Sequence, residues 1–296
     1  METAAPPTKN RYADAPKNAD YTIDQAWESY PAEEHDRWDR LFARQREILP
    51  GRACDAFLEA LDTLSLSEAG VPNMERLSDR LEKLTGWRVV PVADLVPDAV
   101  FFDHLANRRF PAGAFIRPEA EFDYLQEPDV FHDIFGHVPM LADPVFAEFM
   151  EAYGKGGQRA IRRDQLHNLA RLYWYTVEFG LVESVDGLRI FGAGIASSPR
   201  ESVFALEDPS PNRIRLKIER VMRTRYIIDD FQRSYFVIDS FEDLLDRCYR
   251  DFADLYEAVE GAADIAPQDV VEGDEVIHRG TQAYFERDEN VSPQTG

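Results

Sequence analysis

The sequence predicts a mainly α-helical protein of the α+β class, with a few short antiparallel strands. Two observations carry this prediction. Apolar residues recur at helical spacing along most of the chain, whereas strand-like runs are short and few. A third observation concerns organisation, because no internal repeat and no long linker rich in Gly, Ser or Pro interrupts residues 21–263. We therefore expect one compact helical domain over these residues.

Helical periodicity begins in the first third of the chain. Apolar spacing predicts one helix over residues 31–50 and a second over residues 54–64. A third helix carries apolar residues over 74–84 and stops at Gly86, a residue suited to the left-handed position that follows a helix. These helices should bury one apolar face each.

The strand signals are local and brief. A β-like run at 87–90 precedes two prolines, and two apolar runs at 181–184 and 188–191 flank Asp186-Gly187. An Asp-Gly pair between such runs is a strong signal for a β-hairpin. Two late helices are expected over 242–249 and 252–259.

Both ends of the chain lack a clear periodic pattern. Residues 1–20 are rich in Ala, Pro, Asn and Lys, and we expect them to form a loose tail. Residues 264–296 are acidic and polar with scattered apolar positions, so we expect an extended or disordered end.

Charge and cysteine content narrow the classes of partner. The chain has 33 Lys and Arg against 55 Asp and Glu, a formal charge of −22, so phosphate backbones and anionic membranes would repel it. The two cysteines form no disulfide framework or thiolate metal site. Without a signal peptide or an 18-residue apolar stretch, we expect a reduced, cytoplasmic protein that binds neither nucleic acid nor membranes.

Two of the six histidines, His132 and His137, lie in one short segment. Pro128-Asp129 suits the first turn of a helix, and Gly136 can end it. Side chains five residues apart on a continuous α-helix point about 140° away from each other. We therefore expect the helix to end at Gly136, helped by Pro139, so that both imidazoles can reach one ion.

A third candidate ligand, Glu178, lies in the nearly continuous apolar segment 169–180. A carboxylate there is costly unless it is paired or bound to a metal, and an ion pair with Arg171 or Arg189 is the simpler alternative. Together with the His pair, however, Glu178 predicts a metal site.

Two imidazoles and one carboxylate leave coordination positions open, as in non-haem iron oxygenases and some zinc hydrolases. The five-residue spacing differs from the zincin pattern, in which histidines four apart share one helix face. A zinc hydrolase of another kind therefore remains an alternative. A second alternative is a non-catalytic helical protein in which the two histidines only pack against their neighbours.

Three segments of the chain point to a known family. Residues 127–139, 173–181 and 191–198 resemble, in order, signatures of the pterin-dependent aromatic amino acid hydroxylases, and a looser resemblance spans about residues 30–252. The chain is most similar to the bacterial members that act on phenylalanine. The resemblance implies a catalytic domain over 21–263 with the mixed, mainly helical fold of that family.

The resemblance also implies the chemistry. Fe(II) would be held by His132, His137 and Glu178, with tetrahydrobiopterin or a related tetrahydropterin as cofactor and O₂ as co-substrate. The implied reaction is hydroxylation of L-phenylalanine to L-tyrosine by a monomeric monooxygenase. Tyrosine or tryptophan could replace phenylalanine within the family, because selectivity comes from the shape of the pocket.

Further roles follow from matched positions. Phe101 matches the residue that stacks on the pterin, and Arg117 matches the residue that binds the substrate carboxylate through a bidentate contact. An ordinary core role for Phe101, or an ion pair of Arg117 with Glu119 or Glu121, would be the alternatives. The remaining pterin-side matches are Leu95, Val96, Val100, Asp133 and Tyr173, and the remaining substrate-side matches are Tyr124, Trp174, Phe179 and Ser197.

Overall fold

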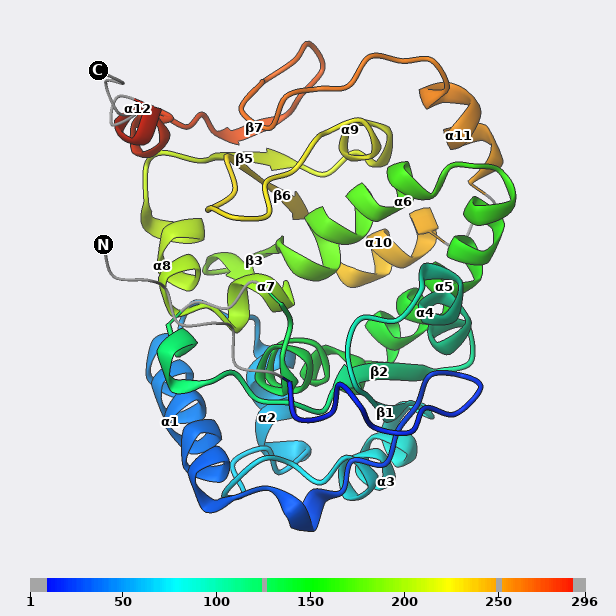
Figure 1. Ribbon diagram of the computed structural model, residues 1–296. Coiled ribbons are helices and arrows are strands. Elements are labelled where there is room, and N and C mark those ends of the chain that lie inside the picture. Colours follow the sequence, from blue (N-terminus) through cyan, green and yellow to red (C-terminus); the bar gives the residue numbers. More distant parts are fainter. Residues whose placement is uncertain (1–9, 124–126, 249–251, 290–296) are drawn as a thin grey trace, which may run out of the picture.

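The computed structural model describes residues 10–123, 127–248 and 252–289. The first and last thirds of the chain lie at opposite ends of the molecule, and the middle third lies between them (Figure 1). Helices dominate, with two small sheets, which confirms the predicted α+β class.

The three helices predicted in the first third are present. They are α1 (Ala32–Ile48), α2 (Asp55–Thr63) and α3 (Met74–Thr85). α3 ends at Gly86, whose φ of 77° is the left-handed conformation expected after a helix. Each helix buries one apolar face, as when α1 buries Trp38 and Leu41, so local periodicity sufficed to locate these elements.

A βαβ unit follows. Strand β1 (Arg88–Val92) pairs in parallel with β2 (Arg109–Gly113), and α4 (Asp98–Ala106) connects them. The predicted strand at 87–90 is therefore confirmed, although its partner is parallel. Helices α5 (Pro144–Arg162) and α6 (Leu166–Tyr173) come next.

A five-stranded sheet lies in the other half of the chain, in the order β4-β3-β6-β5-β7, in which β7 is the short strand Val276–His278. The hairpin expected around Asp186-Gly187 is formed by the antiparallel strands β3 (Gly180–Ser184) and β4 (Gly187–Ile190). In addition to the antiparallel pairs, β6 (Ser234–Ile238) lies parallel to both β3 and β5 (Asn212–Arg215). Long helical connections between these strands permit parallel pairing.

The other helices lie around this sheet and between the two halves (Figure 1). They are α7 (Ala193–Ala196), α8 (Pro199–Glu207), α9 (Ile218–Met222), α10 (Phe241–Cys248), α11 (Ala253–Val259) and α12 (Ala283–Glu289). Short 3₁₀ turns occur at Trp27–Ser29 (η1), Glu119–Glu121 (η2) and Pro139–Ala142 (η4). Helices α10 and α11 confirm the two late helices predicted from periodicity. No helix of the described ranges has the length and apolarity to cross a bilayer.

The described parts of both ends differ from the loose tails expected there. Tyr12 is only 5% exposed, and its hydroxyl donates to the carbonyl of Gln25. Towards the other end, β7 (Val276–His278) pairs with β5, and Phe285 of α12 is 2% exposed. Isolated aromatic residues in polar segments find their contacts on distant elements, which periodicity within the segment does not reveal.

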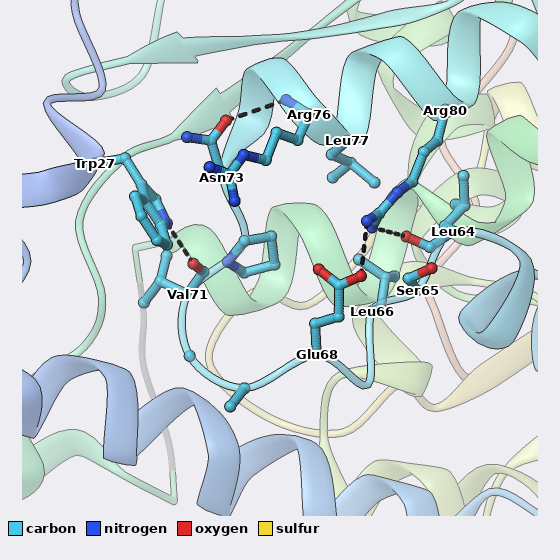
Figure 2. Close-up of a pocket in the computed structure, with 13 residues that line it drawn as sticks. Trp27, Leu64, Ser65, Leu66, Glu68, Val71, Asn73, Arg76, Leu77 and Arg80 are labelled. Atoms are coloured by element: carbon cyan, nitrogen blue, oxygen red, sulfur yellow. Dashed lines mark hydrogen bonds and ion pairs between the residues drawn. The ribbon is translucent and has the colours of Figure 1, made fainter.

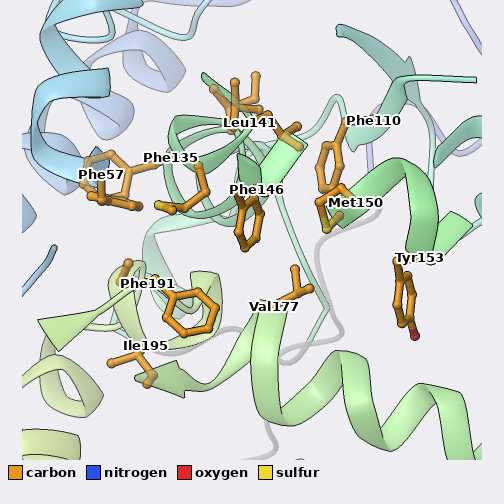
Figure 3. Packing of buried hydrophobic residues seen from close by; sticks show 14 of the residues in the cluster. Phe57, Phe110, Phe135, Leu141, Phe146, Met150, Tyr153, Val177, Phe191 and Ile195 are labelled. Atoms are coloured by element: carbon orange, nitrogen blue, oxygen red, sulfur yellow. The ribbon is translucent and has the colours of Figure 1, made fainter. Parts of the chain in front are cut away.

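One continuous hydrophobic cluster joins the two halves. Phe135, Phe146, Val177 and Phe191 come from different parts of the chain and lie in the same packed region (Figure 3). This rigid interior supports the two segments that carry the predicted metal ligands.

A pocket elsewhere in the molecule lies between Trp27, the 64–73 loop and α3 (Figure 2). Arg80 of α3 closes one side, where it donates to the carbonyl of Leu64 and pairs with Glu68. None of the predicted site residues lines this pocket.

Candidate metal centre

His132 and His137 lie on a π-helical segment, η3 (Phe131–His137). The expectation that the helix ends at Gly136 is therefore wrong, because Gly136 lies inside this element and the chain continues into η4. A π-helix is wound more widely, with hydrogen bonds that span five residues, so side chains five apart lie on one side. Winding, rather than termination, brings the two imidazoles together.

Gly136 has a different role, which is to let α7 approach. A Cβ atom at this position would lie 2.9 Å from the carbonyl oxygen of Ala193 and 3.1 Å from its Cβ. Only glycine therefore permits the observed contact between η3 and the start of α7.

Glu178 also comes from a π-helical segment, η5 (Trp174–Glu178), which directly continues α6. The alternative that Glu178 pairs with an arginine is wrong. Arg171 pairs with Asp264, and Arg189 donates to the carbonyls of Asp186 and Leu188. The carboxylate of Glu178 faces the two imidazoles instead.

The three side chains offer ligand atoms that all lie within 4.8 Å of one another. The two Nε2 atoms are 3.3 Å apart, and the Glu178 oxygens lie 3.5 Å from His132 Nε2 and 3.2 Å from His137 Nε2. The side chains of His132 and Glu178 retain 19% and 14% of their exposure, whereas that of His137 retains 4%. The cluster is thus partly exposed to solvent at His132 and Glu178 and buried at His137.

Ser197 sets the tautomer of His132. Its hydroxyl donates to the carbonyl of Ala193 at 2.8 Å, so its oxygen accepts from His132 Nδ1 at 3.0 Å. With the proton on Nδ1, Nε2 presents a lone pair to the cluster, as a metal ligand requires. Ser197 was expected on the substrate side, and here its hydroxyl contacts His132 and the carbonyl of Ala193.

The electrostatics of the cluster favour a bound cation. Burial lowers the pKa of His132 to about 4, against the opposing effect of the Glu178 carboxylate. Burial also disfavours a charged His137, but Glu178 outweighs it and the pKa of His137 is raised. For Glu178, burial acts against ionisation, yet the imidazoles lower its pKa on balance. An ionised carboxylate beside a neutral imidazole is ready to bind a metal.

Two of the predicted pterin-side residues, Phe101 and Tyr173, lie in a chain of aromatic contacts that leads to His137. Phe101 makes an edge contact with Tyr173, with ring centroids 5.8 Å apart, and Tyr173 lies 6.2 Å from the His137 ring. Asp133 accepts from the backbone N–H of Gly113, and burial raises its pKa to about 7. Of the other three matches, Leu95 and Val96 lie between β1 and α4, and Val100 lies in the first turn of α4. Of these, Leu95 is exposed, and Val96 and Val100 are half-buried.

Arg117 is buried and paired with Asp129, rather than with Glu119 or Glu121. Its Nε and Nη2 donate to the two carboxylate oxygens at 2.9 and 2.8 Å, and its backbone N–H donates at 2.8 Å. The same carboxylate accepts from the backbone N–H of His132 at 3.0 Å. Asp129 therefore joins the expected substrate-binding cation to the metal-binding segment, a role that the sequence did not reveal.

Two substrate-side matches lie at the borders of η5, where Trp174 is its first residue and Phe179 follows its last, and we call this pair the aromatic slot. Trp174 and Phe179 have ring centroids 4.8 Å apart, and both are half-buried. Tyr226, which no sequence motif singles out, stacks on Trp174 at 4.4 Å. Tyr124, the other residue expected in this region, lies outside the described residues.

Two imidazoles and a carboxylate that face one another are the donor set of a mononuclear metal site with open coordination positions. Comparisons with known proteins give the family. The model of the biopterin-dependent aromatic amino acid hydroxylases matches residues 9–260. The chain belongs to this family.

Individual relatives agree. The phenylalanine-4-hydroxylase of Caulobacter vibrioides is 61% identical over 265 residues, which are 90% of each protein. That of Ralstonia nicotianae is 56% identical over 263 residues, or 89% of this chain and 84% of the relative.

A structure of Chromobacterium violaceum phenylalanine hydroxylase with iron(III) and 7,8-dihydrobiopterin has a TM-score of 0.85 and 51% identity, covering 88% of this chain and 95% of that one. The predicted family, fold class and enzymatic nature are confirmed. The individual site roles, the oligomeric state and the cytoplasmic location stay predictions.

Proposed function

We propose that this chain hydroxylates L-phenylalanine to L-tyrosine with O₂ and a tetrahydropterin, at a site where His132, His137 and Glu178 hold Fe(II). The observation that carries the proposal is the convergence of three donors within 4.8 Å, with the cluster partly exposed at His132 and Glu178. Homologous structures support the substrate and cofactors, since the Chromobacterium violaceum enzyme was crystallised with iron and phenylalanine and with dihydrobiopterin.

The donor set fits iron. The hydrogen bond from His132 Nδ1 to Ser197 is the outer contact that orients a metal-binding imidazole and makes it a better ligand. When bound, iron and the tetrahydropterin supply what the side chains lack, which is activation of O₂ and two electrons.

Arg117 would orient the amino acid. Its two contacts with Asp129 hold the guanidinium in one plane, and the pair is buried, so the cation is in place before substrate arrives. A substrate carboxylate gains a charge-assisted contact worth roughly 1.5–3 kcal/mol. Binding through the carboxylate would direct the aromatic ring toward Trp174, Phe179 and the metal ligands.

The pterin would bind on the His137 side. Phe101 and Tyr173 give this flank an aromatic surface on which a flat heterocycle can stack. Asp133, held in place by the N–H of Gly113, adds a polar group at its edge. Substrate and pterin together would exclude water from the reacting centre.

The test is reconstitution of the metal-free protein with Fe(II) or Zn(II), followed by turnover with tetrahydrobiopterin and O₂. We expect tyrosine from phenylalanine with iron only, with slower turnover of tyrosine and tryptophan. The matched variant His132→Ala should lose both bound iron and turnover. Consumption of none of the three amino acids by the iron-loaded protein would overturn the proposal.

A further inference from the structure

Trp174 is held by two aromatic rings and by a hydrogen bond at its edge. One face stacks on Tyr226, with centroids 4.4 Å apart and an angle of 18° between the rings. Phe179, the residue after Glu178, packs against it at 4.8 Å. The indole Nε1 donates to Oε1 of Gln232 at 3.0 Å. These contacts therefore hold the Trp174 indole in a single orientation on η5, the element that also carries Glu178.

Gln232 also holds the loop that carries Tyr226. It is 1% exposed, and its Nε2 donates to the carbonyl of Ile227 at 2.8 Å and, at 3.4 Å, to that of Asp230. An indole N–H can only donate and a carbonyl can only accept, so these partners fix the amide orientation. One amide thus links the indole to the 226–230 loop.

Residues 231 and 232, where the 226–230 loop ends, are attached to α8 by buried contacts. The backbone N–H of Gln232 donates to Oε1 of Glu201 on α8 at 3.4 Å, and the Tyr235 hydroxyl donates to the same oxygen at 2.6 Å. Phe231 stacks on Phe204 of α8 at 4.4 Å. The loop is therefore anchored at residues 231–232, while Ile228 at its outer side is 61% exposed.

We propose that Gln232 is a positioning residue for substrate discrimination, which keeps Trp174 and Tyr226 stacked as a rigid wall of the aromatic slot. The inference rests on the proposed function, because it assigns the wall to an amino acid ring. A rigid wall leaves room for the phenyl ring of phenylalanine but not for the larger indole ring of a tryptophan substrate. Without the hydrogen bonds of Gln232, the wall could move and admit the larger ring. Gln232 touches neither substrate nor metal in this role and acts through Trp174.

The decisive variant is Gln232→Met, which keeps the side-chain length and removes all three amide hydrogen bonds. We expect the ratio of kcat/KM for tryptophan to that for phenylalanine to rise about tenfold, the lower range for a misfit in an apolar pocket. The change should come mainly from a lower KM for tryptophan, because the freed wall admits the larger indole, with kcat less affected. In the Trp174→Phe background the same substitution should change the ratio little, because coupled residues are not additive.

Tyr235→Phe is the matched control. It removes a buried hydroxyl from Glu201 but keeps all three amide hydrogen bonds of Gln232, so it should lower the melting temperature and leave the ratio unchanged. A Gln232→Met ratio within twofold of the original, or full additivity with Trp174→Phe, overturns the proposal. If Gln232→Met does not fold, Tyr226→Leu removes the stacked ring alone and must raise the ratio, and an unchanged ratio is equally decisive.

Failure of the proposed function is a separate outcome. If the original iron-loaded chain turns over no amino acid, quenching of tryptophan fluorescence tests whether Gln232 holds Trp174 in place. The Trp174→Phe variant serves to isolate the Trp174 signal. Gln232→Met should make that signal more sensitive to acrylamide. Unchanged quenching would show that Gln232 does not hold the indole.

Discussion

His132 and His137 lie five residues apart on one π-helical segment, and their Nε2 atoms are 3.3 Å apart. The same two side chains on an α-helix would diverge by about 140°. The proposed metal centre therefore depends on a rare backbone conformation, which the contacts around η3 must stabilise.

Replacement of Gly136 by Ala tests that dependence. The new methyl group would meet the Ala193 carbonyl at 2.9 Å, so α7 or η3 must move. We expect a loss of roughly 1–3 kcal/mol in the free energy of unfolding, typical of overpacking, together with reduced iron binding. Urea unfolding and iron content measure the two effects.

Gly156→Ala is the control, because its Cβ would make only an ordinary contact at 3.5 Å with Phe252. This change in α5 should leave iron binding intact and should not lower stability. Equal effects of the two substitutions would contradict the role given to Gly136.

Ser197→Ala removes the acceptor for His132 Nδ1–H. We expect iron affinity to fall by roughly 10- to 100-fold, the usual effect of losing such an outer contact. Competition with a chelator measures the affinity. Ser198→Ala, which removes only the N-cap of α8, should cost about 1 kcal/mol of stability and leave iron affinity unchanged.

Arg117→Lys keeps the positive charge and loses the planar contact with Asp129. We expect KM for phenylalanine to rise by about tenfold or more, because a charge-assisted contact is worth roughly 1.5–3 kcal/mol. Steady-state kinetics at saturating pterin measure this change. Arg40→Lys, at a surface pair with Glu119, is the control, and a similar KM in both variants would refute the assignment.

Glu201 makes stability depend on pH. Burial raises the pKa of this carboxyl from 4.5 to about 7, against the opposing effect of the Tyr235 hydroxyl. Between these values the folded state binds more protons than the unfolded state, so stability should fall as pH rises from about 4.5 to 7. Above pH 7 the loss in the free energy of unfolding is on the order of 3 kcal/mol, and below pH 4.5 this loss vanishes.

Glu201→Gln keeps an acceptor for Tyr235 and removes the ionisation. The variant should be more stable than the original chain above pH 7, and the difference should shrink toward pH 4.5. Urea unfolding of the metal-free proteins at several pH values measures this difference. A difference that stays constant with pH would show that Glu201 does not titrate in this range.

Local pattern was sufficient for several elements. Helices α1, α2 and α3 and the β3–β4 hairpin follow from apolar spacing and from turn residues within each segment. The predicted helices do not include α5, whose three glycines at 154, 156 and 157 weaken its local signal. Packing against α4 holds that helix instead, and packing between distant segments is absent from a local pattern.

The sequence alone singled out the three candidate ligands, from the spacing of two histidines and from a carboxylate in an apolar segment, which is costly to bury unless it is paired or metal-bound. The amino-acid order therefore determined the helices, the hairpin, the family and the chemical nature of the site. Only the tertiary structure decided the π-helical winding of η3, the pairing of Arg117 with Asp129, and the link from Gln232 to Trp174. These features arise from contacts between segments far apart in the chain, whose energies no local spacing records.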